Sequence, residues 1–177
     1  MNSNELMAVL KCMLKDEKIK NYGVVPADQF EYVLKKSAPK VYIVNTKPAS
    51  IYMGHWVCIF ELEKNVLEFF DPLAFDISVY GKYFLPLLKF NPLVNSFRIQ
   101  SLSSIQCGKF VTFYLYYRLR DNSMCKIVNQ FSCNRKMNDK KVIKFYKSHF
   151  SNVKICSVKP NQCCCSHIKL LRNKIIY

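Results

Sequence analysis

Four side chains of this sequence could together hydrolyse a peptide bond: His55, Asp71, Gln100 and Cys107. A thiolate attacks a carbonyl carbon readily once a neighbouring base has taken its proton. A carboxylate can orient that base, and an amide can donate a hydrogen bond to the developing oxyanion. We therefore interpret Cys107 as the nucleophile and His55 as the general base. Asp71 would orient His55, and Gln100 would serve as the oxyanion donor.

Each of these residues also has an ordinary structural explanation. A free cysteine is most often a small core residue, and an aspartate before proline is often a turn residue. Position favours function for Cys107, because it begins a helical pattern instead of lying on the apolar face of one. Asp76 is an alternative acid and Gln106 an alternative amide donor. We prefer Gln100, since Gln106 directly precedes the nucleophile.

The elements that must position these side chains follow from hydrophobic patterns. Residues 56–61 and 66–70 are typical of two strands joined by a tight turn. Antiparallel pairing would bring His55, before the first strand, beside Asp71, after the second. Cys107 would begin a helix, whose dipole and free N–H groups lower the pKa of a thiol.

Further patterns complete an α+β fold with a central mixed or antiparallel sheet flanked by helices. We expect four further helices: one after caps at Asn2–Asn4, one after a capping box at Asp28 and Glu31, one over 79–88 and one after a cap at Asn138. We also expect strands over 41–45 and 95–101 and a loop over 18–26. The length predicts a single domain over residues 1–177. Residues 151–177 would form a basic, cysteine-rich and loosely ordered tail.

The nine cysteines do not predict a disulfide framework, because their number is odd and their spacing irregular. The N-terminal residues lack a secretory pattern and no apolar run could span a membrane, so we expect a soluble, unsecreted protein with reduced thiols. Cys163–Cys165 with His167 resembles a metal site, but consecutive thiols converge poorly on one tetrahedral ion. We therefore expect no metal and no small-molecule cofactor.

The charge is strongly basic and unevenly spread. The chain carries a net charge of +15, and residues 135–177 hold eleven Lys and Arg against one acid, Asp139. A field of this sign favours a polyanion, and nucleic acid is preferred over a merely solvated basic face. The expected DNA contacts are Lys140, Lys141, Lys144 and Lys147.

The order His, acid, Gln, Cys resembles that of the adenovirus endopeptidase (adenain) family of cysteine proteases, whose clan includes the ubiquitin-like-protein proteases. The likeness extends from the first predicted helix to Phe150 and is most specific in three segments. They are Val44–Thr46 followed by Gly54-His55-Trp56, the run Phe70–Phe75, and Gln100 through Cys107-Gly108. Two features depart from the family. The acid is Asp71, where adenain usually has Glu. The segment between Asp71 and Gln100 contains no cysteine, whereas adenain has there the thiol that bonds its activating peptide.

The resemblance implies a cysteine-protease fold and a monomeric viral-type endopeptidase. Its substrates would be viral precursor proteins cut after small residues, DNA and a short activating viral peptide would be its cofactors, and it would act in the virion and host nucleus. A protease of ubiquitin-like modifiers is an alternative with the same chemistry. An alternative of another class is a catalytically idle, DNA-binding virion protein.

Overall fold

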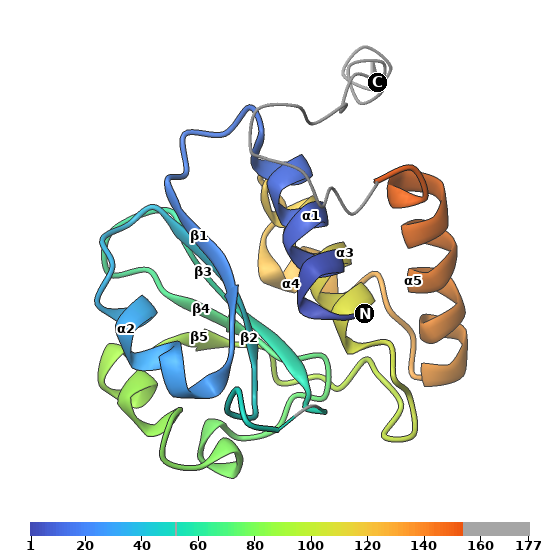
Figure 1. Cartoon of the computed structure of the whole chain (residues 1–177). Coiled ribbons are helices and arrows are strands. Elements are labelled where there is room, and N and C mark those ends of the chain that lie inside the picture. Colours follow the sequence, from blue (N-terminus) through green and yellow to red (C-terminus); the bar gives the residue numbers. More distant parts are fainter. Residues whose placement is uncertain (52, 154–177) are drawn as a thin grey trace.

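The computed structural model describes residues 1–51 and 53–153, which fold as an α+β protein (Figure 1). In chain order the elements are α1 (Ser3–Leu14), β1 (Asn21–Val25), η1 (Ala27–Gln29), α2 (Phe30–Leu34), β2 (Lys40–Asn45), β3 (Trp56–Glu61), β4 (Glu68–Phe70), η2 (Ile77–Tyr80), η3 (Leu85–Phe90), β5 (Leu93–Val94), α3 (Cys107–Arg118), α4 (Met124–Val128) and α5 (Arg135–Phe150). The α+β class is as expected from the sequence. Most of the expected tail, with Cys163–Cys165 and His167, lies outside the described residues.

The five strands form one mixed sheet in the order β1-β2-β3-β4-β5. The central pairs β2–β3 and β3–β4 are antiparallel, whereas β1 pairs parallel to β2 and β5 parallel to β4. The expected hairpin between β3 and β4 is therefore confirmed. Cys58 of β3 is opposite Phe70 of β4, which places the start of β3 and the end of β4 at the same end of the sheet.

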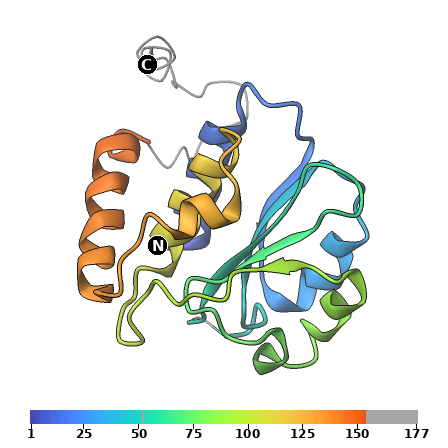
Figure 2. The ribbon, with the colours of Figure 1, turned by 180° about the vertical axis from the view of Figure 1, so that it is seen from behind.

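Helices cover both faces of the sheet, and the alternation of strand side chains supplies a core to each face. Helices α1, α3, α4 and α5 lie on one side, and α2 with the 3-10 segments lies on the other, as the two opposed views show (Figures 1 and 2). On β3, Trp56, Cys58 and Phe60 face the first group, while Val57 and Ile59 face the second. All six β3 residues are buried, as expected for a central strand covered on both faces.

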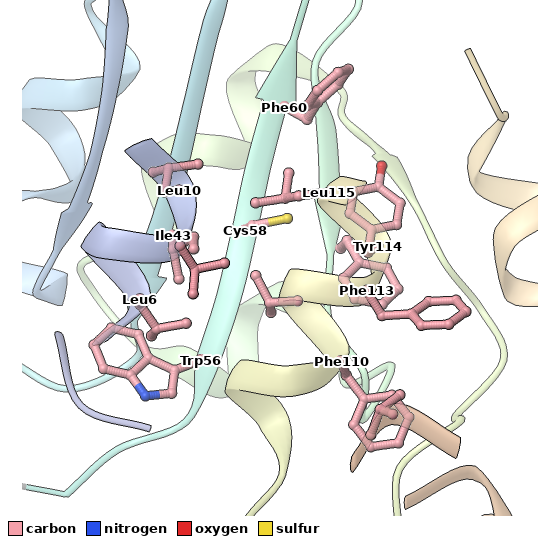
Figure 3. Packing of buried hydrophobic residues seen from close by; sticks show 14 of the residues in the cluster. Leu6, Leu10, Ile43, Trp56, Cys58, Phe60, Phe110, Phe113, Tyr114 and Leu115 are labelled. Carbon is pink, nitrogen blue, oxygen red and sulfur yellow. The ribbon is translucent and has the colours of Figure 1, made fainter. Parts of the chain in front are cut away.

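The core beside α3 is aromatic and closely packed (Figure 3). Phe70 stacks on Tyr114 with ring centroids 4.1 Å apart and planes 3° from parallel. Because Phe70 immediately precedes Asp71 and Tyr114 lies on the helix that begins with Cys107, this stack fixes the end of β4 against the nucleophile's helix.

Several expected elements are wrong in type. The expected loop over 18–26 contains strand β1, whose polar first residue and Gly23 obscure its alternation. The expected helix over 79–88 is replaced by the 3-10 segments η2 and η3; Pro86 lies in the first turn of η3, a position that proline tolerates. The expected strand over 95–101 is not a strand. There, the N–H groups of Ile99 and Gln100 both donate to the Pro72 carbonyl, so the backbone turns instead of running along a neighbour.

Two expected helix caps are also wrong. Asp28 does not cap α2, because its carboxylate accepts a hydrogen bond from the N–H of Ala49 in a distant loop. Helix α5 is capped by Asn134 and not by Asn138. The cap of α1 is confirmed, since Asn2 and Glu5 form a reciprocal capping box. Helix α4 was not predicted; it is five residues long and its buried face is short.

Candidate active site

His55 and Asp71 meet at the end of the β3–β4 hairpin, as the sequence predicts. His55 immediately precedes β3 and Asp71 immediately follows β4. Nε2 of His55 lies 2.6 Å from Oδ1 of Asp71 across 16 positions of sequence. The backbone of His55 is held as well, because its N–H donates to Oγ1 of Thr46 and its carbonyl accepts from the N–H of Thr46.

Cys107 is the first residue of α3, and its thiol is hydrogen-bonded to the side chain of His55. Nε2 of His55 is bound to Asp71, which leaves Nδ1 for the thiol. The backbone N–H groups of Trp56 and Gly108 also bind the sulfur. His55 therefore bridges the nucleophile and the carboxylate.

Asp71 is 1% exposed, and each of its two carboxylate oxygens has two hydrogen-bond partners. Oδ1 accepts from His55 and from the N–H of Leu73, while Oδ2 accepts from the N–H of Phe75 and the hydroxyl of Tyr80. A buried carboxylate with several donors is held in the ionised form. Asp76, the alternative acid, instead caps η2 through Ser78 and does not contact His55.

The protonation equilibria favour an ion pair between His55 and Cys107. Burial lowers the pKa of His55, but its hydrogen bonds to Asp71 and Cys107 and their negative charges outweigh burial and raise the pKa to about 9. Burial raises the pKa of the Cys107 thiol, yet the hydrogen bond and charge of His55 dominate and hold that pKa below its ordinary value. The pKa of Asp71 is likewise lowered, because its hydrogen bonds outweigh burial. Both shifts favour the imidazolium–thiolate pair over the neutral pair.

Gln100 lies at the start of the segment that leads to Cys107 and is 1% exposed. Its Nε2 donates to the carbonyl of Ser104 at 2.8 Å, and its buried Oε1 has no partner among the described residues. Nε2 carries a second hydrogen that this contact does not use. Gln106, the alternative donor, accepts a hydrogen bond at Oε1 from Nζ of Lys109 at 2.5 Å, a contact that does not use its amide hydrogens.

Two glycines permit close backbone approach at the site. A Cβ on Gly54 would lie 1.9 Å from Oδ1 of Asn45, so any other residue before His55 would have to displace the Asn45 side chain. A Cβ on Gly108 would lie 3.1 Å from Cβ of Met1, whose carbonyl accepts a hydrogen bond from the indole N–H of Trp56. The first residue of the chain thus packs against the turn that begins with Cys107.

Sequence reasoning missed two side chains that hold Asp71. The Tyr80 hydroxyl binds Oδ2, and its ring stacks on that of His55. The amide of Asn95 makes two hydrogen bonds to the backbone of Asp71, accepting from its N–H at 2.9 Å and donating to its carbonyl at 2.7 Å. Asn95 lies 24 positions along the chain, and no local pattern marks either residue.

The lysines expected to contact DNA divide into two sets on α5. Lys140, Lys144 and Lys147 are exposed and, with Lys136, recur at helical spacing along one stripe. Lys141 turns inward: its Nζ donates to the carbonyl of Gln130 at 2.5 Å and lies 5.0 Å from the ring centroid of Phe131. Burial lowers its pKa. The ammonium of the half-buried Lys141 is therefore engaged within the protein, unlike those of the exposed stripe.

Within residues 1–51 and 53–153, no group of three or more His, Cys, Asp or Glu side chains is placed to hold a metal ion. In the same residues, no helix is long and apolar enough to cross a membrane. Cys58, Cys107, Cys125 and Cys133 are free thiols.

No family model matches the sequence, and no curated protein matches it significantly.

Proposed function

We propose that this protein is a cysteine-type endopeptidase with Cys107 as nucleophile. The observation that carries the proposal is the position of His55, which is hydrogen-bonded to Cys107 and, at 2.6 Å, to Asp71. Three residues from a strand start, a strand end and a helix start converge on one chain of hydrogen bonds. Such an arrangement of nucleophile, base and orienting acid supports acyl transfer on unrelated folds.

In the proposed reaction, the Cys107 thiolate attacks the carbonyl carbon of the scissile bond and forms a tetrahedral oxyanion. The imidazolium of His55 then gives its proton to the departing amine, and the C–N bond breaks to leave a thioester. His55 next takes a proton from water, whose oxygen attacks the thioester; the C–S bond breaks and releases the acid and the Cys107 thiolate, which restores the ion pair with the His55 imidazolium. Asp71, buried and ionised, holds His55 in orientation and stabilises its positive charge through both steps.

The oxyanion would be stabilised by the N–H of Cys107 and the unused amide hydrogen of Gln100. The N–H of Cys107 is at the first position of α3, where helix N–H groups lack intrahelical partners. The hydrogen bond from Gln100 to Ser104 supports this role, because it holds the amide in a fixed orientation. Fixed donors aimed at developing charge commonly provide a large part of the rate enhancement.

The substrates and setting are proposed from the motifs shared with the adenain family. The protein would cleave viral precursor proteins in the virion and host nucleus, with the cysteine-protease fold of that family. The mixed sheet with the nucleophile at a helix start supports this fold. A protease of ubiquitin-like modifiers would use the same catalytic residues, so the substrate distinguishes the two.

DNA is the proposed cofactor, and its proposed contact surface is the lysine stripe of α5: Lys136, Lys140, Lys144 and Lys147. This helix is joined to the segment before Cys107 at several points. Asn138 donates to the carbonyl of Ile99, and the Ser104 hydroxyl donates to Asp139 at 2.8 Å. A polyanion that ordered α5 would therefore also order the residues that hold Gln100.

The decisive experiment measures cleavage of a fluorogenic peptide that ends in glycine, with and without duplex DNA. We expect turnover by the wild type and by Cys125→Ala, whose thiol is exposed and remote in sequence, and none by Cys107→Ala. Equal turnover by wild type and Cys107→Ala would refute the proposal. Preferential cleavage of intact ubiquitin-like conjugates would favour the modifier protease, and absence of turnover with an unreactive Cys107 would favour an idle, DNA-binding protein.

A further inference from the structure

A second basic feature lies at the opposite end of the sheet from the candidate active site. It is a cleft of about 530 Å³ between the end of α2, the β3–β4 turn and the end of η3. In the β2–β3 pair, Lys40 faces Glu61 at this end, and Asn45 faces Trp56 at the other. Five residue steps separate the two ends, or about 17 Å along a strand. The cleft is therefore separate from His55 and Cys107.

The floor of the cleft is an ion pair that is already satisfied. Lys40 is 3% exposed, and its Nζ lies 2.7 Å from the Glu61 carboxylate. The same ammonium donates to the carbonyls of Leu34 and Lys36, which end α2. Glu61 also accepts from the N–H of Asn65. The negative charge inside the cleft is thus fully engaged by Lys40.

Three further lysines line the cleft, Lys36, Lys64 and Lys89. Glu61 is the single acidic residue in its lining, so four lysines and one glutamate line the cleft; the ammonium of Lys36 lies 4.1 Å from the ring centroid of Tyr32. Among the described residues, neither Lys64 nor Lys89 forms an ion pair, and Glu31, whose charge is felt by Lys89, is paired with Lys35. The rim therefore carries positive charge that no described carboxylate neutralises.

The walls between these lysines are apolar. Leu34, Leu67 and Phe90 line the cleft, and the Phe90 side chain is partly exposed there. A cleft of this volume is in the range that holds small ligands, and such sites combine apolar walls with a few charged groups. Lysine ammonium groups bind phosphate as point charges.

We propose that this cleft binds a phosphorylated small molecule of nucleotide size. Lys64 and Lys89 bind its phosphate groups, with Lys36 beside them, and Phe90 contacts its uncharged part. The site is independent of the proposed peptidase activity and of the lysine stripe on α5.

Isothermal titration of the full chain with ATP, inorganic tripolyphosphate and adenosine tests the proposal. We expect ATP and tripolyphosphate to bind and adenosine to bind at least about tenfold more weakly than ATP, because charge-assisted contacts are lost. Lys64→Ala with Lys89→Ala should weaken ATP binding by at least about tenfold. The double variant Lys140→Ala with Lys144→Ala is the control, because it removes the same charge from α5. It should change the affinity for ATP less than about twofold.

Phe90→Ala should reduce ATP affinity but leave that of tripolyphosphate unchanged. Equal weakening by the two double variants would mean that net charge alone attracts the probes, and adenosine binding as tightly as ATP would show that phosphate is not recognised. Either result, or no binding of any probe, overturns the proposal. The cleft residues Lys64, Lys89 and Phe90 lie at the opposite end of the sheet from Cys107, so a peptidase assay on their variants tests the active site separately.

Discussion

The hydroxyl of Tyr80 donates to Oδ2 of Asp71 at 2.6 Å. Since Oδ1 of the same carboxylate faces His55, the two oxygens are bound from opposite sides and the carboxylate cannot rotate without losing hydrogen bonds. The ring of Tyr80 also lies 6.2 Å from that of His55, with planes 19° apart. Tyr80 thus positions the acid and restricts the ring that the acid orients.

Tyr80→Phe removes this hydroxyl while keeping the ring. We expect the free energy of unfolding to fall by about 1–3 kcal/mol, because the buried carboxylate of Asp71 loses one hydrogen-bond donor. Catalytic efficiency should fall about two- to tenfold through looser positioning of Asp71. Urea unfolding and peptide hydrolysis measure the two effects. Tyr83→Phe is the matched control, and an equal loss in that variant would remove Tyr80 from the site.

Asp71→Asn tests the orienting acid. The amide has one acceptor oxygen where the carboxylate has two, and it carries no charge to stabilise the imidazolium of His55. Peptidase activity should fall by about two to four orders of magnitude, as for the equivalent residue of other triads. Asp76→Asn alters an exposed cap of η2 and should retain activity within about twofold. Comparable activity in both variants would contradict the role of Asp71.

The pH dependence of Cys107 alkylation tests the ion pair. With the pKa of Cys107 lowered and that of His55 raised to about 9, thiolate and imidazolium coexist between the two values. Reactivity should therefore rise with pH through a thiol pKa that lies below the ordinary value. In His55→Ala, the thiol loses the hydrogen bond and the positive charge that lower its pKa most, while burial still raises that pKa, so the rate near neutral pH should fall at least about tenfold.

Iodoacetamide labelling followed by peptide mass analysis makes this measurement, because it separates Cys107 from the exposed Cys125 and Cys133. His149→Ala is the control, since His149 lies on α5 against Phe145. Equal neutral-pH rates in wild type and His55→Ala would mean that no ion pair forms.

Adjacent lysines of α5 should respond differently to DNA. Lys140→Ala removes an exposed charge, so the affinity for DNA should fall. The slope of the logarithm of the DNA association constant against the logarithm of the salt concentration should become smaller in magnitude by about 0.9 for duplex DNA. Lys141→Ala should leave that slope unchanged but lower the melting temperature, because Lys141 binds the Gln130 carbonyl inside the fold. Fluorescence anisotropy of labelled DNA across a salt series provides the slopes. Identical slopes for the two variants would exclude the stripe as the contact surface.

The meeting of His55 and Asp71 could be predicted from sequence because antiparallel pairing of two strands that are close in sequence places the start of the first beside the end of the second. The start of α3 at Cys107 could also be predicted, since a long apolar pattern follows it. These are local signals, and each acts over one or two elements.

The remaining contacts of the site depend on long-range packing, which hydrophobic periodicity does not encode. Asn95 was expected in a strand, but its amide pairs with the backbone of Asp71. Asn138 was expected as a cap, but it is buried and binds the carbonyl of Ile99, 39 positions away. Lys141 was expected on the surface because its charge is visible in sequence, whereas its direction on the helix depends on where α5 packs.

The contact of Trp56 with Met1 also gives the molecule an intrinsic optical reporter. Trp56 is the only tryptophan of the chain, is 7% exposed, and has its backbone N–H bound to the sulfur of Cys107. All indole fluorescence therefore originates beside the nucleophile. Its intensity and emission wavelength will register alkylation of the thiol, release of the first residue from α3, or entry of water, without any attached dye.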